Sequence, residues 1–118
     1  MFKIKGILYL VITGLMAVAP LNAAGTDKGL VCIDPGHQLK GNSGLEPMAP
    51  GSNVKKAKVS SGTRGVATKK NEYQLTLEVG LKLRDALKTK GYPVYMIRET
   101  NDVNISNKER AEKANSMG

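Results

Sequence analysis

A short apolar run, residues 30–33 (Leu-Val-Cys-Ile), ends at the breaking tetrapeptide of residues 34–37 (Asp-Pro-Gly-His). An uninterrupted apolar run bounded by Pro and Gly is typical of a strand that is buried on both faces in a parallel sheet. In open α/β sheets, ligands and catalytic groups gather just beyond the carboxyl ends of such strands. The sequence therefore predicts that His37, its only histidine, lies at a chemically useful edge of a sheet.

The strongest helical pattern in the chain follows at residues 71–90. Asn71 is a suitable N-cap with Gln74 three residues later, and Gly91 marks the end. At about 100° per residue, one apolar stripe is expected to pack on the sheet. Its members are Leu75, Val79, Leu83, Ala86 and Leu87. A second apolar line, expected to face a neighbouring element, consists of Tyr73, Leu77 and Leu81.

The rest of the chain completes an α/β pattern. Residues 93–97 are predicted to form a second strand, with Arg98 at its carboxyl end positioned to pair with Glu99 or Asp102. Residues 106–109 match a capping box and predict a final helix that runs to Met117. A strand, a helix and a strand in this order favour a parallel pair. The fold class is thus α/β, a partial parallel-sheet, three-layer domain with the order β, loop or hairpin, α, β, α.

Residues 38–70 contain many Gly, Pro and Ser residues and show no helical period, so we predict one long connection there. A loop of that length inside a compact domain is usually functional. Val59 and Val66 flank a glycine-containing segment that predicts a hairpin with its turn near Gly62. We expect this hairpin to form a flap at the rim of the site.

Glu72 opens the predicted helix and falls inside the Leu75 stripe, so its carboxylate is expected to point inward, whereas Glu78 points to solvent. A helix that follows a strand begins at the sheet edge where that strand ends, so His37 and Glu72 can meet. Imidazole and carboxylate groups are ordinary zinc ligands, and a catalytic zinc takes three protein ligands and a water. Two simpler interpretations stay open: a hydrogen-bonded loop histidine, and a glutamate that serves the helix dipole.

Several separated blocks carry a resemblance to a known family. They are residues 31–37 (Val-Cys-Ile-Asp-Pro-Gly-His), 61–68 (Ser-Gly-Thr-Arg-Gly-Val-Ala-Thr), 71–73 (Asn-Glu-Tyr), 91–98 (Gly-Tyr-Pro-Val-Tyr-Met-Ile-Arg) and 108–112 (Lys-Glu-Arg-Ala-Glu). From about residue 30 onward, the chain resembles the zinc-dependent N-acetylmuramoyl-L-alanine amidases of type 3. The resemblance implies that His37 and Glu72 are the first two zinc ligands. It also implies hydrolysis of the amide between N-acetylmuramic acid and L-alanine in peptidoglycan.

The resemblance also identifies what is missing. Members of the family carry a second ligand histidine on the strand after the Arg110 helix, and a glutamate general base further on, and neither occurs here. We therefore expect residues 25–118 to be the N-terminal portion of the catalytic domain, truncated before the third family strand. The general base is expected beyond Gly118, and the chain alone is expected to be inactive. Asp34 is expected either to orient the imidazole of His37 or to cap the Pro-Gly turn.

Residues 1–24 have the layout of a secretory signal peptide. Lys3 and Lys5 precede an apolar stretch, and small residues follow near Ala23 and Ala24. The stretch is short for a membrane span, so we expect contact with the membrane only during export. The predicted location is extracellular, at the cell wall.

The charge balance fits an exported protein with anionic partners. The chain has 18 basic and 10 acidic residues, and removal of the predicted signal leaves a net charge of about +6. Peptidoglycan carboxylates and anionic wall polymers are the expected partners. Nucleic acid is disfavoured because the basic residues are scattered and the chain has one Phe and no Trp. The alternative function is a non-catalytic exported module that binds anionic cell-wall polymer.

Cys32 is the only cysteine, so the sequence offers no disulfide framework. Its place between Val31 and Ile33 favours a buried small hydrophobe over a nucleophile.

Overall fold

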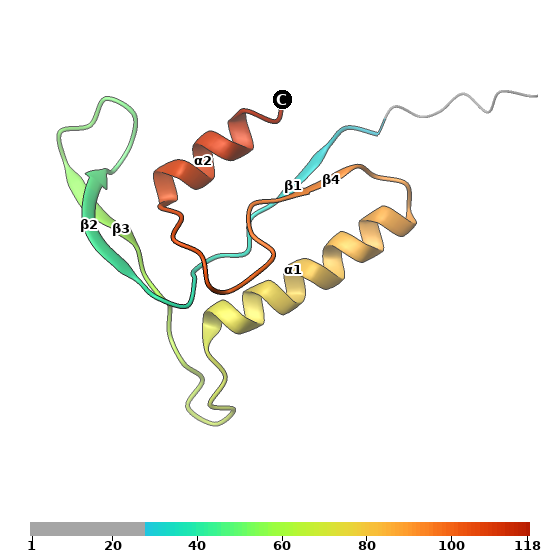
Figure 1. The fold of residues 1–118 in the computed structure, drawn as a ribbon, viewed down its shortest axis with the longest axis horizontal. Helices are drawn as coiled ribbons and strands as arrows, with labels where there is room; N and C mark the ends of the chain where they lie inside the picture. Colours follow the sequence, from blue (N-terminus) through green and yellow to red (C-terminus); the bar gives the residue numbers. More distant parts are fainter. Residues whose placement is uncertain (1–27) are drawn as a thin grey trace, which may run out of the picture.

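The computed structural model describes residues 28–118, and the predicted signal peptide of residues 1–24 lies outside them. The elements along this part of the chain are β1 (Val31–Ile33), β2 (Asn42–Pro47), β3 (Lys55–Val59), α1 (Glu72–Thr89), β4 (Val94–Met96) and α2 (Asn107–Asn115) (Figure 1). Among these residues, no helix is long and apolar enough to cross a membrane.

The predicted parallel pair is present. β1 and β4 are hydrogen-bonded side by side, with Val31 opposite Val94 and Ile33 opposite Met96, and α1 lies on the connection between them. β4 is a residue shorter at each end than the predicted strand of residues 93–97, and β1 begins one residue into the apolar run of residues 30–33. Ile97 N still donates to Ile33 O at 2.9 Å, which carries the pairing past the end of β4. The buried apolar side chains of the described residues are Ile33, Val59, Leu77, Met96 and Ile97.

The connection between β1 and α1 differs from the prediction. β2 and β3 form an antiparallel hairpin, with Leu45 opposite Ala57, and Met48 N donates to Val54 O at 2.9 Å near its turn. The predicted single loop over residues 38–70 is therefore wrong, and so is the predicted hairpin about Gly62. These two strands are mostly polar (Asn-Ser-Gly-Leu-Glu-Pro and Lys-Lys-Ala-Lys-Val), so they lack the strong apolar alternation that marks a strand in the sequence.

The predicted flap is a projecting loop rather than a hairpin (Figure 1). It joins β3 to α1, and within it an isolated antiparallel bridge pairs Arg64 with Asn71. The loop therefore leads directly into the first turn of α1.

The helix boundaries follow the predicted signals closely. Asn71 N donates to Gln74 Oε1 at 3.2 Å at the start of α1, which ends just before Gly91 with its φ of 78°. At α2, Ser106 Oγ accepts from Glu109 N at 3.2 Å, and Ser106 N donates to Glu109 Oε2 at 2.7 Å. The predicted capping box of α2 is confirmed, although the helix ends at Asn115 rather than Met117.

α1 packs through the side of Leu77, which the sequence predicted to face a neighbouring element rather than the sheet. Leu75, Val79 and Leu83 are 49%, 57% and 47% exposed, so the predicted packing stripe faces away from the core. Leu77 and Gly80 are buried instead. A Cβ on Gly80 would lie 2.9 Å from Pro35 Cγ, so the missing side chain lets α1 approach the loop after β1.

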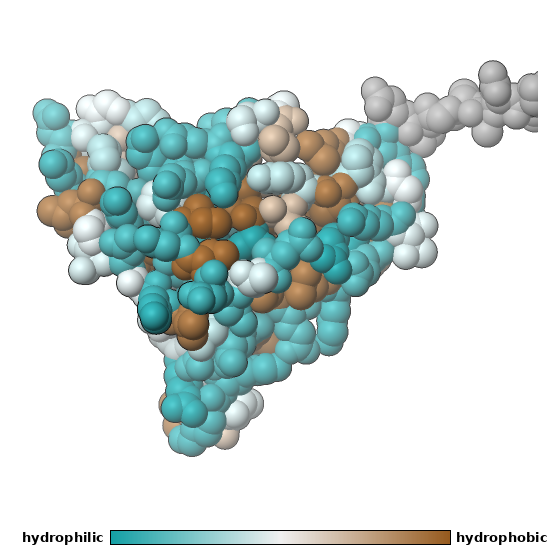
Figure 2. All heavy atoms as spheres, viewed as in Figure 1, coloured by the Kyte–Doolittle hydropathy of each residue, from teal (hydrophilic) through white to brown (hydrophobic). Residues whose placement is uncertain are grey.

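The core of this part of the chain is small. Hydrophobic residues reach the surface in the middle of the face shown in Figure 2, between hydrophilic ones. The sheet edge with the loop after β1 is nevertheless well ordered by polar contacts, and it carries the predicted site residues.

Candidate metal centre

His37 lies in the loop that follows β1, and its backbone is unusual. Its φ is 63°, in the left-handed region that side chains with a Cβ rarely adopt. Its imidazole Nε2 lies 3.3 Å from Glu72 Oε1. The predicted meeting of these two residues at the start of α1 is confirmed, while their role as metal ligands stays a prediction.

The other ring nitrogen of His37 is held by the residue after β3. His37 Nδ1 lies 3.2 Å from the carbonyl oxygen of Ser60 and 3.1 Å from its Oγ. Nδ1 can donate to the carbonyl oxygen or accept from the hydroxyl, and either contact holds the ring in place. A proton on Nε2 can be donated to Glu72 Oε1, and a bound metal would replace that proton.

Glu72 is tethered in the same manner through one of its two oxygens. Its Oε2 accepts from Thr63 N at 2.9 Å and from Thr63 Oγ1 at 3.0 Å. These two hydrogen bonds lower the pKa of Glu72, and the nearby His37 adds to this against a smaller opposing effect of desolvation. The carboxylate therefore stays ionised, with Oε1 directed at the imidazole.

Gly62 fits between the two donor groups because it has no side chain. Its φ is 80°, and a Cβ would lie 2.8 Å from Glu72 Oε2 and 2.9 Å from His37 Cγ. Any other residue would have to displace one of these side chains, so the site needs glycine here.

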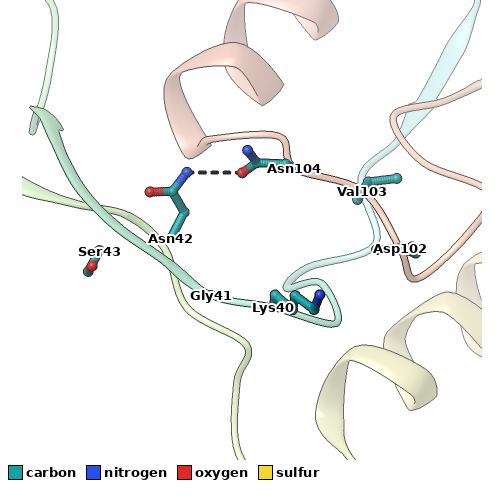
Figure 3. A pocket seen from close by; sticks show the side chains of 7 residues that line it. All are labelled: Lys40, Gly41, Asn42, Ser43, Asp102, Val103 and Asn104. Carbon is teal, nitrogen blue, oxygen red and sulfur yellow. Dashed lines mark hydrogen bonds between the residues drawn. The ribbon is translucent and has the colours of Figure 1, made fainter.

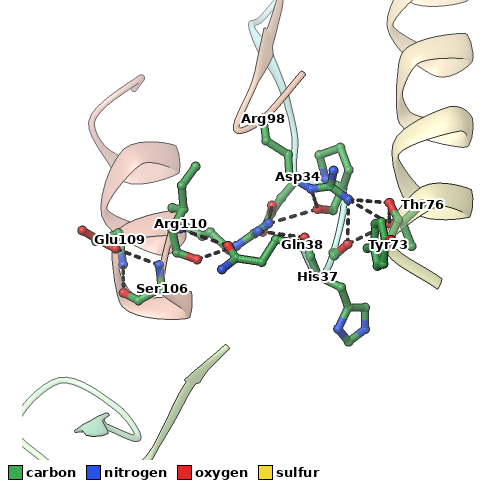
Figure 4. A network of polar contacts seen from close by, with 12 residues as sticks. Asp34, His37, Gln38, Tyr73, Thr76, Arg98, Ser106, Glu109 and Arg110 are labelled. Atoms are coloured by element: carbon green, nitrogen blue, oxygen red, sulfur yellow. Dashed lines mark hydrogen bonds and ion pairs between the residues drawn. The ribbon is translucent and has the colours of Figure 1, made fainter. Parts of the chain in front are cut away.

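Two buried arginines hold the loop that carries His37 (Figure 4). Arg98, at the end of β4, donates through Nε to Pro35 O at 2.7 Å, and through Nη2 to Gly36 O at 3.0 Å and Tyr73 O at 2.9 Å. Burial and the charge of Arg110 lower the pKa of Arg98, and Asp34 opposes this. Main-chain carbonyls, rather than the carboxylates predicted from the sequence, thus accept the hydrogen bonds of Arg98.

The predicted pairing of Arg98 with Glu99 or Asp102 is accordingly wrong. Arg98 Nη1 donates to Thr100 O and to Asn101 Oδ1, while Glu99 pairs with Arg84 on α1. The guanidinium of Arg98 is buried against the loop after β1, whereas Glu99 is exposed.

Arg110, from α2, contacts the same loop. It donates through Nη1 to Pro35 O at 3.0 Å and through Nη2 to His37 O at 3.0 Å, and Nη1 also pairs with Asp34. Asp34 therefore neither orients the imidazole nor caps the turn through its side chain, and both predicted roles are replaced by this ion pair. Figure 4 shows the imidazole pointing away from the arginines, so they contact the loop but not the ring.

Gln38 is a structural residue that sequence reasoning missed. Its side chain is fully buried, with Nε2 donating to Lys40 O at 2.8 Å and Oε1 accepting from Ile105 N at 3.0 Å. A glutamine in a polar loop gives no sequence signal for burial. It fastens the segment after His37 to the start of α2.

A polar cleft of about 540 Å³ lies beyond this segment (Figure 3). Asn42 Nδ2 donates to Asn104 Oδ1 across it at 3.0 Å. Lys40 and Asp102 also line it, but His37 and Glu72 do not.

Cys32 is half-buried in β1, and burial together with the nearby Asp34 raises the pKa of its thiol. A thiol of this kind is a poor nucleophile.

His37 and Glu72 are the candidate metal ligands that the structure brings together. No group of three or more His, Cys, Asp or Glu residues within residues 28–118 is placed to hold a metal ion. His37 Nε2 and Glu72 Oε1 thus offer two donor atoms, and the remaining polar atom of each side chain is held by the β3 to α1 loop.

A family model described as N-acetylmuramoyl-L-alanine amidase matches residues 31–118. The chain belongs to this amidase family. Among curated proteins no match was found. A solved N-acetylmuramyl-L-alanine amidase, Ami1 from Mycobacterium smegmatis, is similar, with a TM-score of 0.64 and 28% sequence identity. The match covers 74% of this chain and 41% of the Ami1 chain, so this amidase chain spans less than half of that solved structure.

Proposed function

We propose that this chain supplies the first two zinc ligands, His37 and Glu72, of an enzyme that hydrolyses the amide between N-acetylmuramic acid and L-alanine in peptidoglycan. Membership of the amidase family supports the reaction class. The observation that carries the assignment of the ligands is the contact of 3.3 Å between His37 Nε2 and Glu72 Oε1. In the complete domain these residues belong to a three-layer fold, of which residues 25–118 are the N-terminal portion.

The donor set fits zinc. Zinc takes imidazole nitrogen and carboxylate oxygen, and its histidine ligands usually donate their other N–H to a carbonyl or a carboxylate. With zinc on Nε2, His37 would donate through Nδ1 to the carbonyl of Ser60 at 3.2 Å, and Glu72 is fixed by Thr63. When bound there with an open position, zinc supplies a water with a pKa near neutrality.

Several residues of the chain have a supporting part in this proposal. Ser60 holds the imidazole of His37 through Nδ1, and Thr63 keeps Glu72 ionised and directed at His37. The third ligand cannot be a second histidine of this chain, since the sequence has only one. The family resemblance implies that this ligand and the general base come from residues beyond Gly118.

Location and partners are part of the same proposal. The amino-terminal pattern of residues 1–24 supports export, and peptidoglycan is the substrate that the family implies. The excess of basic residues supports contact with anionic wall polymers.

Zinc titration of the 118-residue chain tests the assignment. Because His37 is the sole histidine, its imidazole gives the only histidine signals in a ¹H–¹⁵N spectrum. We expect zinc to shift Nε2, and Glu72→Gln to weaken binding by about tenfold or more, since a neutral amide oxygen is a much poorer ligand than a carboxylate.

Glu78→Gln is the matched control. Glu78 lies on the same helix and pairs with Lys70 and Lys82, so its loss should leave zinc binding unchanged. Equal affinity of the wild type and Glu72→Gln would contradict the ligand role and favour a helix-dipole role for Glu72.

A further inference from the structure

We infer that Arg98 and Arg110 are positioning residues for His37, which hold its backbone in the one conformation that directs the imidazole at Glu72. The inference rests on the proposed function, because the orientation of the ring matters if His37 binds zinc. The orientation itself can be tested without zinc.

The two guanidinium groups satisfy three consecutive carbonyls of the loop. Both donate to Pro35 O, Arg98 also donates to Gly36 O, and Arg110 also donates to His37 O, at distances from 2.7 to 3.0 Å. The Gly36 carbonyl accepts a further bond from Thr76 Oγ1 at 2.7 Å. These three carbonyls belong to the loop that carries the candidate ligand.

The two buried arginines face a single carboxylate, an arrangement that stability alone does not explain. Arg98 and Arg110 are 2% and 4% exposed; Asp34 pairs with Arg110, and Arg98 has no carboxylate partner among the described residues. Burying two cations beside one carboxylate is costly, and apolar residues of similar volume often give equal or better stability. Rigid guanidinium forks can hold several acceptors at fixed angles, which an apolar core cannot do.

The left-handed backbone of His37 explains why such restraint is needed. With a φ of 63°, His37 would relax toward negative φ if its carbonyl and that of Gly36 were released. That rotation would swing the Cα–Cβ bond and carry Nε2 away from Glu72. The bonds to the Gly36 and His37 carbonyls thus preserve the contact of 3.3 Å.

Arg110→Lys in the full 118-residue chain is the direct test. Lysine keeps the positive charge but lacks the fork that reaches Asp34, Pro35 and His37 together. In the zinc-free protein, we expect the wild type to show the single set of imidazole signals of a fixed ring, and the variant to show averaged ring signals. With ZnCl₂ as the probe, we expect affinity to fall by about 10- to 100-fold.

Arg84→Lys is the matched control, because Arg84 pairs with Asp85 and Glu99 at the surface of α1. It should change neither the ring signals nor the zinc affinity. Circular dichroism and thermal unfolding establish that each variant is folded. A folded Arg110→Lys variant with wild-type ring signals and wild-type zinc affinity would overturn the inference.

Thr76→Val keeps the test decisive if Arg110→Lys does not fold. It is nearly isosteric, and it removes the donor to Gly36 O together with an acceptor of Arg98 Nη2. We expect averaged ring signals here too, and unchanged signals would count against the inference. If the wild type shows the signals of a fixed ring but does not bind zinc, the proposed function fails while the positioning role stands.

Discussion

His37 and Glu72 each present one atom to the other and use their remaining polar atom as a tether. Both tethers come from the same short segment, since Ser60 contacts the imidazole and Thr63 contacts the carboxylate, on either side of Gly62. A displacement of this segment would therefore disturb both donor atoms together. The site depends on loop geometry at least as much as on the two ligands.

Gly62→Ala is expected to be destabilising and to separate the two donor groups. The alanine Cβ would lie 2.8 Å from Glu72 Oε2 in addition to adopting a φ of 80°. Gly51→Ala is the matched control, because Gly51 has a φ of 74° but nothing within 4 Å of an added Cβ. We expect Gly51→Ala to cost about 1 kcal/mol of unfolding free energy, and Gly62→Ala about 1–3 kcal/mol more.

Chemical denaturation measures both losses, and the imidazole spectrum reports on His37. Equal losses for the two alanine variants, with unchanged ring signals, would show that Gly62 is needed only for its backbone conformation.

At the scale of single residues, the sequence predicts the candidate ligands His37 and Glu72 but not the residues that hold them. A residue at the end of a strand and one at the start of the next helix must share a sheet edge, so the meeting of His37 and Glu72 follows from topology. Ser60 and Thr63 are different, because their positions depend on the course of a hairpin that has little apolar alternation. The partners of Arg98 are mostly main-chain carbonyls, and a sequence does not show which carbonyls will accept a hydrogen bond.

α1 illustrates how an element with two apolar lines can mislead. The Leu75 line and the Leu77 line lie on nearly opposite sides of the helix, and the larger one is exposed. Gly80 lies on the side of Leu77 and approaches Pro35, and Thr76 donates to Gly36 O from the neighbouring turn. Small and hydrogen-bonding residues therefore decided the orientation, although the apolar count favoured the other face.

Truncation of α1 side chains should distinguish these two faces. Leu77 is 8% exposed, so Leu77→Ala is expected to cost about 2–4 kcal/mol of unfolding free energy. Val79 is 57% exposed, so Val79→Ala should change it by no more than about 0.5 kcal/mol. If Leu77→Ala and Val79→Ala lower the unfolding free energy equally in urea denaturation, the Leu75 stripe is a packing face of the isolated chain after all.

The hairpin is joined to α2 by one buried carboxylate. Glu46 is 5% exposed, and it accepts from Lys56 Nζ at 2.7 Å and from Lys108 N at 3.3 Å, at the amino-terminal end of α2. Burial alone would raise the pKa of Glu46, but bonds from Lys56, Ser106 and Lys108 outweigh it and lower the pKa below 4.5. The ionised group is also well placed in the dipole field of α2.

This pKa shift predicts acid sensitivity. A carboxylate whose folded pKa is depressed contributes stability above its unfolded pKa, and the contribution is lost as the pH falls through the folded value. Unfolding free energy should therefore decline below about pH 4.5, and Glu46→Gln should flatten this decline. At pH 7 the substitution should cost about 1–3 kcal/mol.

Glu112→Gln is the control for Glu46→Gln, since Glu112 is exposed and pairs only with Lys108 one turn away. It should leave the stability at pH 7 nearly unchanged. Denaturation curves between about pH 3 and pH 7 measure both variants, and an acid limb that is equally steep in Glu46→Gln and the wild type would exclude Glu46 as its source.

At the scale of the whole molecule, export is the first property to test. The Lys3 and Lys5 start, the apolar stretch and the small residues near Ala23 predict cleavage after Ala23 or Ala24. Amino-terminal sequencing of protein recovered outside the cell should begin at residue 24 or 25. An intact Met1 on cytoplasmic protein would contradict the predicted location.

Catalysis is the property that the whole chain is not expected to show by itself. The sequence has one histidine, the described residues offer two donor atoms for zinc, and two ligands cannot exclude competing water and buffer from the metal. We expect the purified 118-residue chain to release no stem peptide from peptidoglycan, with or without added zinc. A chimera in which residues 31–118 replace the aligned part of the Mycobacterium smegmatis amidase should hydrolyse it, and His37→Ala in that chimera should abolish hydrolysis. Chelator-sensitive cleavage by the 118-residue chain would mean that a complete site exists within it, and the assignment of only two ligands would be wrong.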